Sequence, residues 1–386
     1  MTDTFLGYAR ADGTAGVRNH LLILSVTGLT GPTARRVGRS LPRATVVATP
    51  YGSGLLGEDA AANGRALIGF GTHPNVGAVV VIGADPPKVA EIGAAIEQSG
   101  RPVVALTLDE CGHDALTLTD RAVRAGAGLL RALSRQRRTP VPLAELRLGL
   151  ECGRSDPSSG LVANPLIGRI ADQVADLGGV AMIGETTEWL GAEHLLAARA
   201  KTPEVEAAIR AAAEGREAMA VAAGIDLTGN NPGATNIAAG LSSIEEKSLG
   251  AIAKSGSRPI SGVLRYGERP DGAGLYLMDA PAYAPESLGG FTAAGSNLVL
   301  FSTGVGNSYV SALAPTLKLS GNPETCARIG EQLDFDAGAV FTGETDIEEA
   351  ANALFATLLD IASGSLTWGE VLAEGDEVIS RFGPVL

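Results

Sequence analysis

Two short apolar runs in the second half of the chain each end in an acidic side chain. Glu151 directly follows LRLGL, and Glu185 directly follows GVAMIG. If the two runs are neighbouring strands of a parallel sheet, both carboxylates lie at its carboxyl edge, where open α/β sheets bind ligands. Paired carboxylates at that edge can hold a divalent cation or transfer protons. The spacing therefore predicts a functional site around Glu151 and Glu185.

Small polar residues follow Glu151 and lead into a helical pattern. They include Arg154, Ser155, Ser158 and Ser159. Hydroxyls and backbone N–H groups at the start of a helix suit an anionic group such as a carboxylate. The same residue types also cap helices without any ligand. The sequence leaves both interpretations open.

Further polar residues follow Glu185 in the segment ETTEWLGAEH. Glu188 and Glu193 are also typical of the acidic first turn of a helix, so we prefer Glu185 as the functional acid. His194 fits a structural role as well as a catalytic one.

The segment from Thr228 to Gly256 combines a polar loop with a predicted helix. Its candidate side chains are Asn230, Asn231 and Asn236 in the loop, and Glu246 and Lys247 near the start of the predicted helix Leu241–Lys254. Adjacent acids and lysines usually form a solvated helix face. In a cleft, however, the pKa of Lys247 can fall far enough for the amine to act as a base.

The stretch GSGLLG, Gly52–Gly57, formally matches the dinucleotide-binding pattern GxGxxG. That fingerprint also requires an acidic residue about 20 positions later. The apolar run Val76–Ile82 occupies that place. We therefore interpret the stretch as a tight turn, and a nicotinamide-dependent enzyme is disfavoured.

The first third of the chain alternates continuous apolar runs with amphipathic segments. The runs are His20–Val26, Ala44–Thr49, Val76–Gly83 and Arg101–Leu108, and the segments between them are Thr33–Leu41, Glu58–Gly69 and Pro87–Ser99. A further helix is expected from Thr117 to Ser134. Continuous apolar strands separated by helices predict a parallel sheet that is covered on both faces.

The alternation resumes after the basic, proline-containing segment Arg135–Pro142, which we interpret as a domain boundary. Strands are expected in LRLGLEC, GVAMIGE, SGVLRYG, GLYLMD, NLVLFST and PTLKLS, and helices over Asn164–Leu177, Gly191–Arg199, Pro203–Ala223, Ile347–Ala362 and Thr367–Arg381. The predicted fold class is α/β, with two α/β domains whose mainly parallel sheets are flanked by helices. Residues 1–140 form an N-terminal domain of Rossmann or flavodoxin type, and residues 141–386 form the C-terminal catalytic domain.

The composition argues against nucleic-acid and membrane functions. The formal net charge of −13 disfavours a broad nucleic-acid footprint. The longest apolar run, Val76–Ala84, is shorter than the roughly 20 residues that span a bilayer, and the start of the chain lacks the pattern of a secretory signal. Three widely spaced cysteines fit a reducing cytoplasm better than a disulfide framework.

Several ordered motifs resemble those of the altronate/galactarate dehydratase family, the sugar-acid hydro-lyases. They are GYARADGTAGVRNH, ECGRSDPSSGLVANP, GETTEWLGAEHLLAARA, GLSSIEEKSLG, GLYLMDAP, LVLFSTGVGN and SGSLTWGE, and they cover nearly the whole chain. The resemblance implies a cytoplasmic enzyme of carbohydrate catabolism that dehydrates a sugar acid such as altronate or galactarate. In that reaction a base removes the proton next to the carboxylate, the β-hydroxyl leaves as water, and the enol collapses to a 2-keto-3-deoxy acid.

The resemblance also implies a divalent metal ion, because an enolate needs fixed positive charge. Fe²⁺ is the expected ion, with Mg²⁺ and Mn²⁺ as alternatives, and its expected ligands are Cys152, Glu151 and Glu185. The expected catalytic residues are Lys247, Glu185, His194 and Glu246. The expected substrate-binding residues are Arg18, Asn19, Arg154, Ser155, Ser158, Ser159, Asn164, Asn231 and Asn236.

The chain departs from the family pattern in its first part. Tyr51 and Leu55 stand where relatives often carry a histidine and a cysteine, and Leu29 lies near the place of another cysteine. Single-chain relatives carry a small β-rich domain before the motif that starts here at Gly7. By analogy with split relatives, we expect a large subunit that binds a small SAF-like subunit and forms a homo-oligomer. A (2R)-sulfolactate sulfo-lyase, which releases sulfite, and a non-catalytic family member are the alternatives.

Overall fold

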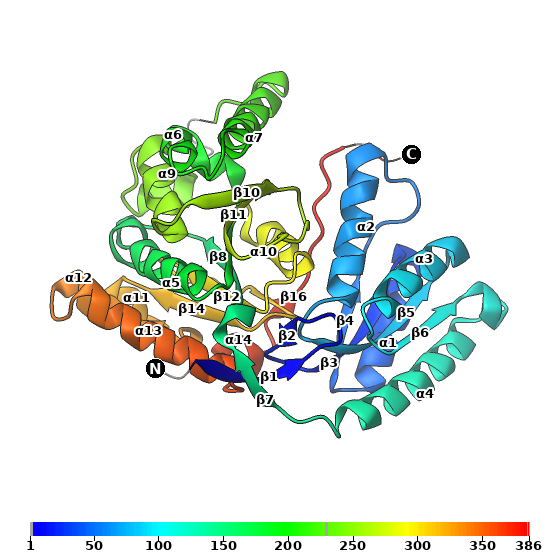
Figure 1. Cartoon of the computed structure of the whole chain (residues 1–386). Coiled ribbons are helices and arrows are strands. Elements are labelled where there is room, and N and C mark those ends of the chain that lie inside the picture. The colour runs from blue at the N-terminus through cyan, green and yellow to red at the C-terminus, as the bar shows by residue number, and fades with distance from the viewer. Residues whose placement is uncertain (1–2, 228–230, 384, 386) are drawn as a thin grey trace.

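The computed structural model describes residues 3–227, 231–383 and 385, so Asn230 lies outside the described residues. Two parallel sheets carry most of the strands, and helices flank both sheets (Figure 1). The predicted α/β fold class is confirmed. Among the described residues, no helix is both long enough and apolar enough to cross a membrane.

The first sheet has the strand order β4-β3-β5-β6, and all of its pairings are parallel. Its strands are β3 (His20–Ser25), β4 (Ala44–Ala48), β5 (Val76–Gly83) and β6 (Val103–Thr107), and its helices are α1 (Gly31–Ser40), α2 (Gly57–Gly71), α3 (Pro86–Glu97) and α4 (Ala115–Leu133). Alternate residues of a strand face opposite sides of a sheet. Leu22 and Val79 pack with α2 and α3. Ile23 and Val80 pack with α1 and α4, which explains why the apolar runs are continuous.

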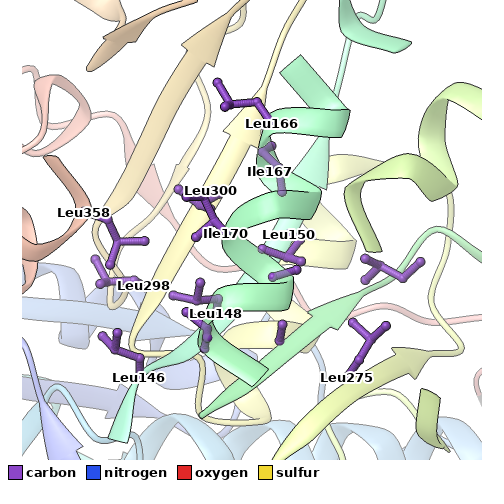
Figure 2. Packing of buried hydrophobic residues seen from close by; sticks show 14 of the residues in the cluster. Leu146, Leu148, Leu150, Leu166, Ile167, Ile170, Leu275, Leu298, Leu300 and Leu358 are labelled. Carbon is purple, nitrogen blue, oxygen red and sulfur yellow. The ribbon is translucent and has the colours of Figure 1, made fainter. Parts of the chain in front are cut away.

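The second sheet has the order β10-β11-β9-β8-β12-β14-β15 and is also parallel throughout. Its strands are β8 (Arg147–Cys152), β9 (Val180–Ile183), β10 (Ile260–Leu264), β11 (Gly274–Met278), β12 (Leu298–Ser302), β14 (Thr316–Ser320) and β15 (Phe335–Asp336). Helices α5 (Asn164–Asp176) and α13 (Ile347–Ala362) pack on one face, and α10 (Ala284–Ala293) packs on the other. Figure 2 shows Ile167 and Ile170 of α5 close to Leu148 and Leu150 of β8.

The remaining elements are short or lie outside the two main sheets. They are α6 (Glu193–Ala197), α7 (Pro203–Ala222), α8 (Ala234–Ala238), α9 (Ile244–Ile252), α11 (Pro323–Arg328), α12 (Gly338–Thr342), α14 (Trp368–Val371), β1 (Thr4–Ala9), β2 (Ala15–Gly16), β7 (Thr139–Pro142), β13 (Val310–Ser311) and β16 (Gly375–Asp376).

Helix α10 also packs against α2, so the two sheets share an apolar cluster. Phe291 of α10, Phe70 of α2 and Met182 of β9 are all buried in it. The two helices approach so closely that a Cβ atom on Gly69 of α2 would lie 2.2 Å from the carbonyl oxygen of Ala293. The contact therefore requires a glycine at position 69.

The segment predicted as a boundary, Arg135–Pro142, contains a strand. Its end forms β7, which pairs antiparallel with β1, and β1 also pairs with β2. Phe5 and Val17, from the start of the chain, pack in the same cluster as Leu148 of the second sheet. A division of the chain at residue 140 therefore stays a prediction.

The prediction of a helix over Thr367–Arg381 is wrong beyond the first turn of that segment. Thr367 caps α14, but Ala373 adopts a left-handed backbone with φ of 55°, which ends the helix. Residues 375–376 then form β16 beside β13.

The C-terminal segment returns from the second sheet to the first. Asp59 of α2 accepts hydrogen bonds from the backbone N–H groups of Phe382, at 2.8 Å, and Gly383, at 2.6 Å. The guanidinium of Arg216 on α7 lies 4.8 Å from the centre of the Phe382 ring. The start of the chain thus packs with the second sheet, and its end packs with the first.

Candidate active site

A buried cluster of charged and polar side chains lies at the carboxyl edge of the second sheet. Its five members are Cys152, Glu185, Glu188, Lys247 and Lys254. The amine of Lys254 lies 3.1 Å from the sulfur of Cys152 and 3.3 Å from Oε2 of Glu185. The amine of Lys247 donates hydrogen bonds to Oε1 of Glu188 and Oδ1 of Asn231. Lys254 is only 1% exposed.

The two acids reach the cluster because the chain turns sharply after β9. Glu185 has the left-handed backbone angles φ 59° and ψ 56°. Such a conformation costs a non-glycine residue about 1–3 kcal/mol and is commonest at functional sites. The turn continues into the 3₁₀ helix η5 (Thr186–Trp189), which brings Glu188 back towards Cys152.

The two lysines come from α9 and from the 3₁₀ turn η6 (Ala253–Ser255) that follows it. Lys247 and Lys254 are seven residues apart, which is about two helical turns. They therefore project from the same side and reach the same acids.

Glu151 lies next to Cys152 in β8 but faces the other side of the sheet. Successive residues of a strand point to opposite faces. Oε2 of Glu151 accepts a hydrogen bond of 2.7 Å from Ser287 of α10. The group of three close ligand atoms is formed by Cys152, Glu185 and Glu188 and does not include Glu151. The carboxyl of Glu151 still interacts with that of Glu185.

Burial and neighbouring charges determine the protonation of the acids. Burial raises the pKa of Glu185 well above its usual range, and the negative charges of Glu151 and Glu188 raise it further. Burial also raises the pKa of the Cys152 thiol. Burial alone would raise the pKa of Glu188, but Lys247 and other positive groups hold it below its usual value. The environment therefore favours the protonated forms of Glu185 and Cys152 and the ionised form of Glu188.

The sequence left open whether the pKa of Lys247 falls, and the structure indicates a shift in the opposite direction. Burial lowers the pKa of Lys247, but the carboxylates of Glu188 and Glu185 raise it by more, so the net shift is upward. The pKa of Lys254 is raised well above its usual value for the same reason, with Cys152 as its main favourable partner after the opposing effect of burial. Both amines are therefore fixed positive charges at neutral pH.

Three members of the cluster are arranged so that they could hold a metal ion. One ligand atom each from Cys152, Glu185 and Glu188 lies within 4.8 Å of the other two, and all three residues are buried. A sulfur ligand combined with carboxylates suits a transition-metal ion better than Mg²⁺. The donor types suit a divalent transition metal. The ammonium of Lys254 lies 3.1 Å from Cys152, 3.3 Å from Glu185 and 3.9 Å from Glu188, so an ion held by all three would have to displace it.

The cluster separates two cavities. The first has a volume of about 300 Å³ and is lined mainly by small and apolar residues, among them Ser159, Leu161, Leu241 and Leu249. The second has a volume of about 500 Å³ and is more polar, with Arg154, Asn236, Tyr283, Asn307 and Tyr309 in its wall. Cys152, Ser155, Glu188 and Lys247 line both cavities. Cavities of this size accept small-molecule ligands.

Comparison with known protein families accounts for most of the chain. Residues 143–385 match the family described as D-galactarate/Altronate dehydratase, C-terminal, and residues 7–134 match the second domain of D-galactarate dehydratase/Altronate hydrolase. The chain belongs to the D-galactarate/altronate dehydratase family. The resemblance predicted from the sequence motifs is confirmed.

Curated relatives of this dehydratase family are similar over nearly the whole chain. The (2R)-sulfolactate sulfo-lyase subunit beta of Chromohalobacter salexigens is 35% identical, over 98% of this chain and 97% of the relative. The altronate dehydratase of Bacillus subtilis is 32% identical, over 94% of this chain and 74% of the relative. The galactarate dehydratase (L-threo-forming) of Escherichia coli is 30% identical, over 94% of this chain and 73% of the relative. The prediction that the chain is a lyase is confirmed.

Four substrate-binding candidates from the dehydratase motifs lie at the cluster or the second cavity. They are Arg154, Ser155, Asn231 and Asn236. The side-chain amide of Asn236 donates to the carbonyl oxygen of Ser155 at 2.9 Å, so the loop after β8 and helix α8 form one wall.

Ser158, Ser159 and Asn164 support the backbone around the first cavity. Ser158 donates a hydrogen bond of 2.6 Å to Asp156, as expected for a segment that stabilises its own turn. Asn164 donates to the carbonyl oxygen of Gly250 at 2.8 Å. Ser159 and Asn164 also line the first cavity, so they remain candidates for ligand contacts.

Arg18 and Asn19, from the first dehydratase motif, make structural contacts away from the cluster. Arg18 forms an ion pair of 2.7 Å with Glu370. Asn19 accepts a hydrogen bond of 2.9 Å from Arg10 and donates one of 3.0 Å to Gln136. Neither residue lines the two cavities beside the cluster.

His194 and Glu246 also have positions that argue against a catalytic role. His194 is exposed on α6. Glu246 lines the first cavity, but its carboxylate accepts a hydrogen bond of 2.7 Å from the N–H group of Ser242 and so caps α9.

Sequence reasoning missed Glu188 and Lys254. The sequence pattern fits Glu188 to an ordinary helix start, because its approach to Cys152 depends on the left-handed turn at Glu185. Lys254 had a usable signal, since it follows Lys247 by about two helical turns on the same predicted helix.

Proposed function

We propose that this chain is a hydro-lyase that removes water from a sugar acid such as altronate or galactarate. The observation that carries the proposal is the buried cluster, which combines two fixed ammonium groups with a potential metal site. Its members Cys152, Glu188 and Lys247 lie in the wall of both cavities. The dehydratase relatives support this choice of substrate, because they are similar to 94% of the chain.

The mechanism must make a weakly acidic proton easier to remove. When the proton next to a carboxylate leaves, negative charge develops on the carboxylate oxygens, and preorganised positive charge lowers that barrier. Lys247 holds its ammonium in the wall of both cavities, with Glu188 and Asn231 fixing its position. We place the substrate carboxylate beside Lys247 and Ser155. Lys254 lies behind Cys152 and Glu185 and acts on the reaction by positioning them.

The metal site is part of the proposal. Cys152, Glu185 and Glu188 would hold the ion, with Fe²⁺ as the expected metal and Mn²⁺ and Mg²⁺ as alternatives. When bound, the ion supplies further positive charge where the enolate forms.

The test is turnover by protein that has been purified without oxygen and supplied with Fe²⁺, Mn²⁺ or Mg²⁺. Altronate and galactarate are offered separately, and the 2-keto acid product is measured. Formation of a 2-keto-3-deoxy acid from either substrate supports the proposal. Metal binding without conversion of either acid, whether or not a partner subunit is present, contradicts it.

A second candidate is elimination of sulfite from (2R)-sulfolactate. It is favoured by sequence similarity, because the sulfo-lyase subunit is 35% identical over 98% of this chain, and the dehydratases are 30–32% identical over 94%. Both reactions begin with removal of the proton next to a carboxylate, and they differ in the group that leaves the β-carbon. Sulfite release from sulfolactate, with no product from the two sugar acids, would select this candidate.

We further propose that the chain works in the cytoplasm with a small partner subunit, in a homo-oligomeric assembly. The partner is suggested by the relative that is named a subunit beta. Co-purification with a protein of about 100 residues, the size of a small domain, is the expected result. Full activity of the chain purified alone would contradict the need for a partner.

A further inference from the structure

A residue that lines the second cavity carries a buried hydrogen-bond donor that has no partner among the described residues. It is Nδ2 of Asn307. The amide orientation is fixed, because its oxygen Oδ1 accepts a hydrogen bond of 3.2 Å from the N–H group of Tyr309. A buried donor that stays unpaired costs about 1–3 kcal/mol. A ligand that supplies an acceptor oxygen would remove this cost.

The loop that carries Asn307 is held in place, so it cannot easily move to satisfy the donor. The carbonyl oxygens of Gly304, Val305 and Asn307 accept hydrogen bonds from Thr325, Arg328 and Lys318, at 2.7, 2.9 and 3.2 Å respectively. Lys318 is fully buried and also forms an ion pair of 2.7 Å with Glu374. The donor of Asn307 is therefore preorganised.

Arg154 brings positive charge to the same wall. Its guanidinium donates a long hydrogen bond of 3.4 Å to the carbonyl oxygen of Gly306, the residue before Asn307. Arg154 lines the second cavity together with Asn307. A guanidinium beside an amide donor matches the oxygens of a carboxylate or a sulfonate, and charge-assisted hydrogen bonds of this kind are stronger than neutral ones.

We propose that Arg154 and Asn307 form a second anion subsite, which makes the cavity selective for dianionic hydroxy acids. The reacting carboxylate lies at Lys247, and the second anionic group, a carboxylate or a sulfonate, lies at Arg154 and Asn307. This inference rests on the proposed function for the assignment of the reacting end. Galactarate and sulfolactate carry two anionic groups, whereas altronate carries one and ends in a hydroxyl group.

The test is binding of unreactive acids to the full-length protein, together with any subunit that co-purifies. The probes are 3-sulfopropionate and succinate, which are dianions, and propionate, which lacks the second anion, each measured by isothermal titration calorimetry. We expect at least one of the dianions to bind about tenfold to a hundredfold more tightly than propionate, as for a hydrogen bond to a charged group. Whichever of the two dianions binds more tightly shows whether the subsite prefers a sulfonate or a carboxylate.

The variant Asn307→Asp provides the sharpest comparison. It keeps the oxygen that accepts from Tyr309 but replaces the amide donor with a second carboxylate oxygen, which repels an anion. We expect the preference for dianions to disappear. Gln98→Glu, at an exposed position at the end of α3, adds the same charge and should retain the preference.

Equal binding of dianions and propionate by the wild-type protein would overturn the inference. A preference that survives in Asn307→Asp would also overturn it. Both measurements are independent of turnover, so an absence of any lyase activity would count against the proposed function and leave the binding result to decide on the subsite.

Discussion

Lys247 is the lysine of the cluster that lines both cavities, so its charge should matter most for turnover. We predict that Lys247→Met lowers kcat/KM by about 10²- to 10³-fold, the effect of removing one preorganised group that stabilises an oxyanion. Lys247→Arg keeps the charge and should retain more activity. Lys201→Met, at an exposed lysine, is the matched control and should leave kcat/KM unchanged. Steady-state kinetics with the preferred acid measure the effect, and equal activity of Lys247→Met and the wild type would exclude the role proposed for Lys247.

Metal binding at the cluster should release protons. The thiol of Cys152 and the carboxyl of Glu185 both have raised pKa values, because burial disfavours their charged forms. An ion that takes both groups as ligands must displace their protons, so we predict about two protons released per ion. Metal affinity should therefore fall as the pH is lowered. Calorimetry in buffers of different ionisation enthalpy measures the proton count, and a metal affinity that does not change with pH would contradict the assignment of these ligands.

At the scale of single residues, the sequence identified residues that end strands, but it could not show which way their side chains point. Cys152 and Glu185 follow apolar runs, and the structure brings them together as expected. Glu151 lies outside the group of three close ligand atoms because neighbouring residues in β8 face opposite sides of the sheet. The spacing of Lys254 from Lys247 is visible in the sequence, but its contact with Cys152 depends on how η6 packs against β8, which is a tertiary contact.

At the scale of elements, the contact between α2 and α10 depends on the absence of a side chain at Gly69. A Cβ atom there would lie 2.2 Å from a backbone oxygen of α10, which cannot shift without moving the helix. We predict that Gly69→Ala lowers the free energy of unfolding by about 1–3 kcal/mol, as for other overpacked cores. Gly64→Ala is a control in the same helix, because a Cβ at Gly64 meets no atom within 4 Å. That control should stabilise the protein by up to about 1 kcal/mol, and denaturant unfolding of both variants is the measurement. Equal effects of the two substitutions would contradict the close approach.

Most elements could be predicted because the strands are buried on both faces. Continuous apolar runs such as β5 are what a strand between two helix layers requires. The prediction of a long C-terminal helix was wrong, because the left-handed backbone at Ala373 ends the helix and β16 pairs with the distant strand β13. Neither feature leaves a periodic signal in the sequence.

For the whole molecule, Glu377 should make stability depend on pH. Burial raises the pKa of Glu377 from 4.5 to about 8. Between these two values the unfolded chain has lost the proton while the folded chain keeps it. The free energy of unfolding should therefore fall as the pH rises from about 5 to about 8, by up to a few kcal/mol.

The variant Glu377→Gln should remove this dependence, because a neutral amide carries no penalty at high pH. We expect its stability relative to the wild type to be greater at pH 8 than at pH 5. Glu331→Gln, at an exposed carboxylate, should follow the wild-type profile. Chemical denaturation across this pH range is the measurement, and parallel profiles for the wild type and Glu377→Gln would rule out the buried carboxyl as the cause.

The apolar cluster that α2 and α10 share has a consequence for how the enzyme moves. The first and second sheets share this cluster, so moving the two sheets apart would expose its apolar side chains to water. Substrate must therefore enter a body that does not hinge, and any gating has to come from individual loops or from another polypeptide. The two halves should also melt together, as one calorimetric peak.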